Sequence, residues 1–577
     1  MLNHYYLQEL AALRDLGAEF AETHPSIASM LSGSSSDPDV ERLLEGVAFL
    51  TGLIREKLDD DFPEIIHDLI HLIWPHYLRP LPSAAIVAFK PKSSLKQSLT
   101  IKKGVQLASL PVEGTSCLFQ TGFEVEVQPI EVVDVAFVET PGMASTIRIK
   151  LETKGTALNN LQLKSLRFFL AGDYSSASDK YFILRHYLRR IVIKATDQES
   201  TFPLHKDKLK PVGLNMDDGI LPYPGNSFPG YRILQEYFTL PENFLFLELT
   251  GLDEWFNRGE GTAFEISFEL EEIPFQMPRI RTKDFVLFAT PVLNLFPHEA
   301  DPVRLDHRRT EYRVRPTTTN PSHFQVYSID RVTGYIQGTA AAREYQHFDH
   351  FNQNGVSGPV YNTSQKKSPS RRVTDSYISV SYPKSNGPPA PETLSIGLTC
   401  TNGVLPDSIQ VGDICKPTSS TPEFITFSNI TTPTAGTQPP LENNLLWRLL
   451  GHLSLNYTSL MDIKNLRTLL DLYLFPDTKD RTALLANQKR INGLQNIRSN
   501  HGDRLVNGIM LRGREIYLEA RYDHFASQGD LYLFASILNE FLAVYSTFNS
   551  FTRFTLKETL RGEIISWPAR IGERPLI

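Results

Sequence analysis

Cysteine, basic charge and long apolar runs are all scarce in this chain. Three cysteines in 577 residues (Cys117, Cys400 and Cys415) are too few for a disulfide framework, and they form no C-x-x-C metal motif. Lysine and arginine (58) are outnumbered by aspartate and glutamate (65), which disfavours a dedicated nucleic-acid binder or a basic membrane-surface protein. No signal peptide is visible, and no apolar run approaches the roughly 20 residues of a membrane span. We therefore expect a soluble, multi-domain protein of a reducing compartment, without membrane insertion.

Sequence motifs of nucleotide and hydrolytic chemistry are also missing. The chain has no G-x-x-x-x-G-K-[ST] phosphate loop and no G-x-S-x-G nucleophile elbow. Gly259 and Gly261 are not followed by the third glycine of a dinucleotide fingerprint. The sequence therefore predicts no enzyme, with no catalytic residues, no cofactor and no resident metal.

One histidine pair resembles a metal motif. His67 and His71 are four residues apart and would share a helix face, as in the H-E-x-x-H zinc motif. Asp68 stands where that motif has its general-base glutamate, and Trp74-Pro75 ends the segment before a third ligand. Ordinary polar contacts are the favoured interpretation, and a metal-dependent hydrolase using His67 and His71 is kept as an alternative.

The amino-terminal part, residues 1–82, has the pattern of amphipathic helices. Apolar side chains recur at three- and four-residue steps in residues 2–20, and a second stripe follows the Asp37-Pro38 helix start. We expect Pro63 to break the second helix, with a third helix over 64–76. Three short helices bury little area by themselves, so their stripes are predicted to pack on other chains or on distant parts of this one.

From Ala84 the hydrophobic period changes to two, which is typical of strands. We predict an α+β multi-domain fold: a β-rich domain over 83–280, a second β-rich region over 281–440, and a mixed helix and strand domain over 441–577. Within the second region, 338–390 is rich in glycine, serine and asparagine and is predicted to be a surface arm, with a basic run at 366–372. Residues 416–440 are predicted to be a connector. In the last domain, helices are expected over 445–460, 463–474, 484–491 and 530–545, and strands over 551–556 and 563–567.

A dense run of charges occupies residues 301–313. If this segment is extended, Asp306 and Arg308 lie on one face, and Arg309, Glu311 and Arg313 lie on the other. Such a pattern suits a ladder of ion pairs. A substrate-carboxylate site and a solvated strand are alternatives, and a domain or subunit junction is favoured.

Short phrases along nearly the whole chain are similar to those of one protein family. They begin with HYYLQEL (4–10), LGAEFA (16–21), DPDVERLLEGVAFL (37–50), LDDDFPE (58–64) and WPHYLRPLPS (74–83). FPGYRILQEYF (228–238), PVLNLF (291–296), LDHRR (305–309), EYRV (311–314), VYSID (326–330), LWRL (446–449), HLSLNY (452–457) and RIGERPL (570–576) continue the series. In this order they resemble TssF, also called VasA or ImpG, of the bacterial type VI secretion system.

The resemblance implies a structural role in a contractile, phage-like machine. TssF proteins are cytoplasmic baseplate subunits, similar to phage-tail wedge proteins, and the baseplate docks to the inner-membrane complex. Two copies pair with one TssG, hold TssK, meet TssE and surround the VgrG spike. The expected partners are thus a second copy, TssG, TssK, TssE and VgrG, and no nucleic acid. A β-rich glycan-binding attachment protein is the remaining alternative.

Two groups of residues are the candidates for partner binding. We expect the helical stripes of several chains to form one bundle. The apolar candidates are Tyr6, Leu13, Phe20, Val40, Leu43, Leu44, Val47, Leu50 and Ile54. The charged candidates are Asp306, Arg308, Arg309, Glu311 and Arg313.

Overall fold

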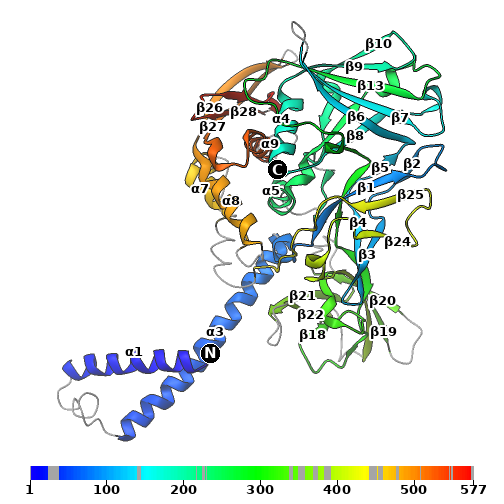
Figure 1. The fold of residues 1–577 in the computed structure, drawn as a ribbon. Helices are drawn as coiled ribbons and strands as arrows, with labels where there is room; N and C mark the ends of the chain where they lie inside the picture. The colour runs from blue at the N-terminus through cyan, green and yellow to red at the C-terminus, as the bar shows by residue number, and fades with distance from the viewer. Residues whose placement is uncertain are drawn as a thin grey trace. The chain divides into compact units, whose positions relative to one another are not determined.

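The computed structural model describes the chain in segments separated by gaps. These are residues 2–23, 38–73, 75–139, 144–215, 218–223, 228, 230–336, 342–348, 358–367, 374–382, 391–440, 451, 459–475, 480–506, 509–544, 546 and 550–572. The chain divides into two compact units, Met1–Leu78 with Glu442–Leu446, and Arg79–Leu441 with Trp447–Ile577 (Figure 1). The first unit is helical and the second is rich in strands, so the fold is mixed α+β, as predicted.

The first unit contains a long helical hairpin. Its helices are α1 (Leu2–Thr23) and α3 (Pro38–Ile73), followed by the 3₁₀ turn η1 (Pro75–Leu78). Pro38 opens α3, and Asp39 and Glu41 in the first turn oppose the positive end of the helix dipole. The prediction of a break at Pro63 was wrong, because α3 continues through it for 36 residues in all. A single proline costs roughly 3 kcal/mol in a helix interior, and α3 accommodates this one without ending.

A six-stranded antiparallel sheet begins the second unit. Its order is β24-β3-β4-β15-β1-β25, where β1 is Ala84–Pro91, β3 Gln106–Val112, β4 Thr115–Thr121, β15 Ala289–Leu293, β24 Ile414–Pro417 and β25 Ile425–Asn429. The Asn429 side-chain oxygen accepts the backbone N–H of Gly412 (3.0 Å) and of Ile414 (2.9 Å), so the two edge strands meet. The ribbon β2 (Leu99–Ile101) and β5 (Val125–Val127) lies beside this sheet (Figure 1).

Two further antiparallel sheets cover residues 130–287. One has the order β10-β9-β13-β7-β6, with β6 Ile130–Val138, β7 Thr146–Thr153, β9 Leu188–Ala195, β10 Thr201–His205 and β13 Ala263–Leu270. The other has the order β11-β12-β8-β14, with β8 Ser165–Leu170, β11 Leu209–Pro211, β12 Phe246–Thr250 and β14 Phe285–Leu287. In β13 buried and half-buried residues alternate strictly, which is the period-two pattern expected for a sheet with one face in the core.

An eight-stranded sheet follows, with the path β16-β23-β19-β20-β21-β22-β18 and β17 beside β23. The strands are β16 Phe296–Glu299, β17 Val303–Leu305, β18 Tyr312–Val314, β19 Gln325–Ile336, β20 Ala342–His347, β21 Val360–Lys367, β22 Thr374–Ser381 and β23 Glu392–Thr401. Three of these strands fall within 338–390. The described part of the predicted surface arm is therefore part of this sheet, and Tyr345, Tyr361 and Ile378 enter the core of the sheet. Likewise, β25 lies inside the predicted connector 416–440.

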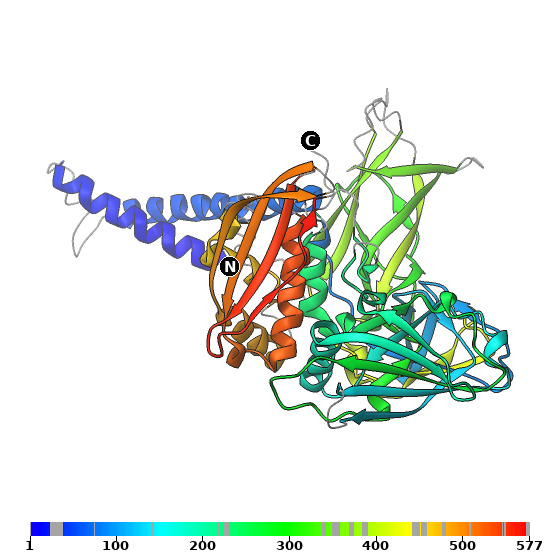
Figure 2. The ribbon, with the colours of Figure 1, turned by 90° about the horizontal axis from the view of Figure 1, so that it is seen from above.

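The carboxy-terminal part combines helices with a twisted sheet. Its elements are α7 (Ile463–Asp471), α8 (Arg481–Gly493), β26 (Leu494–Val506), β27 (Ile509–Ala520), α9 (Gln528–Val544), β28 (Ser550–Glu558), β29 (Ile564–Ser566) and β30 (Arg570–Ile571). β27 and β28 are parallel, and α9 is the crossover helix between them (Figure 2). The predicted helix over 445–460 lies almost wholly outside the described residues.

Helices and short 3₁₀ turns connect the sheets of the second unit. The remaining helices are α4 (Tyr174–His186) and α5 (Gly230–Thr239). The 3₁₀ turns are η2 (Leu158–Asn160), η3 (Lys206–Lys208), η5 (Pro241–Phe244), η6 (Leu252–Glu254), η7 (Thr282–Asp284), η8 (Pro321–His323), η9 (Leu405–Ser408), η10 (Ser459–Met461) and η11 (Tyr522–His524).

Candidate partner-binding surfaces

The two helices of the hairpin pack against each other where α3 carries small residues. Leu10 and Ala48 are buried, and Gly52 lies against the backbone of Tyr6. Near the other end, the Arg14 guanidinium lies 3.2 Å from the Glu41 carboxylate. These pairs show that α1 and α3 are antiparallel. Because the contact uses alanine and glycine, the large apolar residues of α3 are left for other faces.

The predicted stripe on α3 is mostly exposed. Leu43 is 70% exposed, Leu50 60% and Ile54 61%. Val47 is also exposed, and Val40 and Leu44 are half-buried. The exposed members are spaced four, three and four residues apart, which places them in one row along the helix. This row is a candidate surface for packing against another helix.

Phe49 and Leu53 widen this apolar surface beyond the predicted stripe. Both are exposed on α3, and they were not among the predicted residues. Residues 46–54 contain no charged side chain. A helix that is apolar on all sides is normally buried. Full burial of a leucine, isoleucine or phenylalanine side chain contributes about 1.5–3 kcal/mol. Burial of this segment by another helix would therefore stabilise the resulting complex.

The first helix contributes a smaller apolar surface. Phe20 is exposed, whereas Tyr6 and Leu13 are half-buried. Leu7 and Leu16 are exposed and were missed, because the stripe pattern alone does not reveal which flank of α1 is covered by α3. We name the exposed apolar residues of α1 and α3 the hairpin surface; it comprises Leu7, Leu16, Phe20, Leu43, Val47, Phe49, Leu50, Leu53 and Ile54.

The charged segment 301–313 is a turn between two short strands, and not one extended strand. β17 ends at Leu305 and β18 begins at Tyr312. The Asp306 carboxylate accepts the Arg308 backbone N–H (3.2 Å) and the Tyr312 hydroxyl (2.7 Å), and these hydrogen bonds lower the pKa of Asp306. An aspartate that binds its own backbone two residues on favours a turn. The expected placement of Asp306 and Arg308 on one strand face was therefore wrong.

Two of the charged candidates join strands within the eight-stranded sheet. Glu311 pairs with Lys366 (2.8 Å), and Arg313 pairs with Asp375. Lys366 belongs to the basic run that was predicted to be part of a solvated arm. Arg308 and Arg309 are exposed in the turn. The charged group is thus divided between internal ion pairs and one exposed turn.

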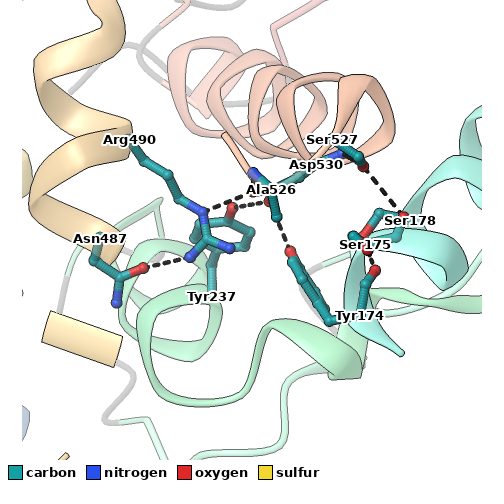
Figure 3. A network of polar contacts seen from close by, with 9 residues as sticks. All are labelled: Tyr174, Ser175, Ser178, Tyr237, Asn487, Arg490, Ala526, Ser527 and Asp530. Atoms are coloured by element: carbon teal, nitrogen blue, oxygen red, sulfur yellow. Dashed lines mark hydrogen bonds and ion pairs between the residues drawn. The ribbon is translucent and has the colours of Figure 1, made fainter. Parts of the chain in front are cut away.

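A buried polar network joins four helical segments of the second unit (Figure 3). The Asp530 carboxylate accepts from the Tyr174 hydroxyl (2.8 Å), the Tyr237 hydroxyl (3.2 Å), Arg490 Nε (2.9 Å) and the Ala526 backbone N–H (3.0 Å). These groups come from α4, α5, α8 and the start of α9. A carboxylate with four donors is saturated, and its geometry is that of a structural junction.

Two of the three cysteines are buried, Cys415 is exposed, and the side chains of the candidate histidine pair lie outside the described residues. Burial raises the pKa of Cys117 to about 11 and that of Cys400 to about 12, so both thiols stay protonated near neutral pH. His67 and His71 lie on α3, but their side chains are outside the described part. Among the described residues, no cluster of three histidine, cysteine, aspartate or glutamate side chains could hold a metal, and no helix is both long and apolar enough to cross a bilayer.

Comparison with known proteins identifies the class of protein to which these surfaces belong. The family model described as "Type VI secretion system, TssF" matches residues 1–574. A protein of Pseudomonas aeruginosa named type VI secretion system component TssF1 is 30% identical, with 100% of this chain and 99% of the relative covered. The chain therefore belongs to the TssF family, whose members are structural subunits of a secretion-system baseplate.

Solved structures agree with this assignment. A chain from a cryo-electron microscopy structure of the type VI secretion system TssK-TssF-TssG baseplate subcomplex is 28% identical, with a TM-score of 0.80. The match covers 93% of this chain and 99% of that one. A chain from the type VI secretion system baseplate complex shares the fold over both full lengths, with a TM-score of 0.59 and 24% identity.

Proposed function

We propose that this chain is a wedge subunit of a type VI secretion baseplate and has no enzymatic activity. Two copies pair with one TssG, the wedge holds TssK, and the assembly meets TssE and surrounds the VgrG spike. The protein acts in the cytoplasm and reaches the inner-membrane complex through the baseplate. Family membership supports this role, and the structural relative in a TssK-TssF-TssG subcomplex supports the choice of TssG and TssK as partners.

The observation that carries the proposal is the hairpin surface. The helical segment 46–54 has no charged residue, and its Leu50 and Ile54 are about three-fifths exposed. Exposing such an apolar surface to water is unfavourable, and packing it against other helices is favourable. Interfaces of permanent complexes resemble a domain core cut in half and often bury more than about 2,000 Å². In this proposal, helices of a second copy and of TssG cover the surface. The glycan-binding and metal-hydrolase alternatives have no comparable support.

The direct test places a charge on this surface in the co-expressed complex. Leu50→Asp leaves the contact between α1 and α3 intact and puts a carboxylate where partner helices are expected to pack. We expect it to abolish co-purification with TssG, while the second unit keeps its protease resistance. Leu485→Asp is the matched control, because Leu485 is 64% exposed on α8. Undiminished co-purification of Leu50→Asp would contradict the proposal.

A second expectation concerns the chain made alone. Without partners the hairpin surface stays in water, so we expect poor solubility that co-expression with TssG restores. A well-behaved monomer that does not bind TssG would count against the proposed role.

A further inference from the structure

The connection between β12 and β13 presents one aromatic ring to solvent. In the loop 251–261, Trp255 is only 4% exposed and packs on Phe264, with ring centroids 5.6 Å apart. The next residue, Phe256, is 87% exposed, the highest value among the large apolar side chains of the described residues. The loop thus buries one aromatic residue and projects its neighbour outward.

A single arginine holds this loop in shape. Arg258 Nε donates to the Trp255 carbonyl (2.8 Å), and the same guanidinium donates to the carbonyls of Leu252 (2.8 Å), Leu163 (3.1 Å) and Leu161. The Arg258 backbone N–H donates to the Phe256 carbonyl (3.1 Å). Five hydrogen bonds from one residue fix the backbone that carries the exposed ring.

The far side of the loop is anchored as well. Asp197, in the turn after β9, accepts the backbone N–H of Gly261 (2.8 Å). Gly259 has a positive φ of 73°, and a β-carbon there would lie 2.7 Å from the Asp197 carboxylate. Exposure of Phe256 is therefore not the result of a loose loop. A loop with a preorganised backbone loses little backbone conformational entropy when a partner covers its exposed side chain.

Acidic residues lie close to Phe256 in the sequence. The loop carries Asp253, Glu254 and Glu260, and its only basic residue, Arg258, is engaged with carbonyl groups. Asp253, Glu254 and Glu260 are all exposed, and Glu254 is paired with Lys208 (2.7 Å). The loop itself carries more acidic than basic residues, which favours a partner with a basic contact surface.

We propose that Phe256 is an anchor residue that enters an apolar pocket on a protein partner, with lysine or arginine side chains at the rim of the pocket facing Asp253 and Glu260. Rigid aromatic residues at the centre of a small contact contribute most of the binding free energy in many interfaces. This docking surface lies in the second unit and shares no residue with the hairpin surface. It is therefore a second contact, independent of the helical bundle.

The experiment uses the chain co-expressed with TssG and TssK. A photo-reactive phenylalanine analogue replaces Phe256 in one complex and Phe424 in a control complex, because Phe424 is 51% exposed and follows the acidic Glu423. We expect the probe at 256 to label one protein at a segment containing apolar and basic residues. Labelling of lipid, of a second copy of this chain, or of an acidic segment would overturn the proposal, as would labelling no stronger than that at 424.

Binding assays with the labelled protein then measure how much Phe256 and the two carboxylates contribute to the affinity. Phe256→Ala should weaken binding about 30-fold, typical of a central aromatic residue, without changing thermal stability. Asp253→Asn combined with Glu260→Gln should weaken binding and reduce its dependence on salt. Phe424→Ala and Glu423→Gln are the matched controls and should leave binding unchanged. Wild-type affinity of Phe256→Ala would refute the anchor role.

Discussion

The backbone of Tyr6 passes so close to Gly52 that a β-carbon on Gly52 would lie 3.1 Å from the Tyr6 nitrogen. The separation of α1 and α3 is therefore set by a residue without a side chain. This close approach places the small residues of α3 inside the hairpin and its leucines outside. The hairpin surface thus depends on a contact on the opposite face of the same helix.

We expect Gly52→Leu to push α1 away from α3. The new side chain would overlap the backbone of Tyr6, which cannot rotate aside as a flexible side chain can. Cleavage of α1 by a protease in the intact chain should become faster. Gly46→Ala is the control: nothing lies within 4 Å of a β-carbon there, and alanine should stabilise the helix by about 1 kcal/mol. Equal cleavage of Gly52→Leu and wild type would refute the close-contact argument.

The ion pair between Arg490 and Asp530 should be costly to break from one side. The side chain of Asp530 is fully buried and that of Arg490 is 10% exposed. Asp530→Ala leaves a buried guanidinium without its carboxylate, and such losses cost about 3–5 kcal/mol. Denaturant unfolding followed by fluorescence measures the change. The control is Arg512→Met, which breaks the exposed ion pair with Asp503 and should lower the free energy of unfolding by less than about 1 kcal/mol. Similar losses for the two variants would contradict the role of the Arg490–Asp530 pair as a buried junction.

Gly529 at the start of α9 is a second position where a methyl group has no room. Its β-carbon would lie 2.1 Å from the carbonyl oxygen of Ser178, on α4. Gly529→Ala must separate α4 from α9, so we expect a melting temperature several degrees lower. Gly358→Ala, where a β-carbon meets nothing within 4 Å, is the control. An unchanged melting temperature for Gly529→Ala would show that the two helices can move apart freely.

The stability of the second unit should depend on pH through Glu236. Its buried carboxylate accepts the backbone N–H groups of Ile220 (2.9 Å) and Leu221 (3.0 Å), with Arg232 and Lys103 nearby. Burial outweighs these neighbours and raises the pKa of Glu236 above its usual value. The folded state then binds the proton more tightly than the unfolded state. The stability from protonated Glu236 is present below pH about 4.3 and is lost as pH rises through the folded-state pKa.

Glu236→Gln keeps an acceptor for both backbone groups and removes the titration. Relative to wild type, this variant should gain stability as pH rises from 4, until the difference reaches a plateau. Melting temperatures between pH 4 and 8 measure it, with exposed Glu199→Gln as control. A difference that does not change with pH would contradict the raised pKa.

Hydrophobic periodicity predicted the elements whose faces are clearly divided. The helix over residues 2–20 was confirmed from its three- and four-residue period. The helix predicted over 530–545 was confirmed as α9 from its run of apolar residues. The exposed stripe of α3 was also predicted from residue types. Exposure itself needed the structure, since Gly52 and Ala48 determine which flank α1 covers.

The missed elements are those whose conformation is set by hydrogen bonds and not by a hydrophobic pattern. The sequence of β26 is polar around Asn500 and His501 and shows no strand pattern. It forms a strand because β27 pairs with it along its whole length. The Asn507-Gly508 pair between valine and isoleucine was the available hairpin signal. The charged run at 306–313 became a turn because Asp306 binds its own backbone, a local competition that a two-residue period cannot show.

The position of β1 between β15 and β25 has a consequence for the order of folding. One neighbour pairs with Ala84–Ala88 through residues 289–293, and the other pairs with Val87–Pro91 through residues 425–429. On the ribosome, this early strand emerges long before either neighbour has been synthesised. The entire eight-stranded sheet is encoded between the two, so it can complete its own pairing while the first sheet still lacks an edge. Translation thus finishes the inserted domain before the domain that encloses it.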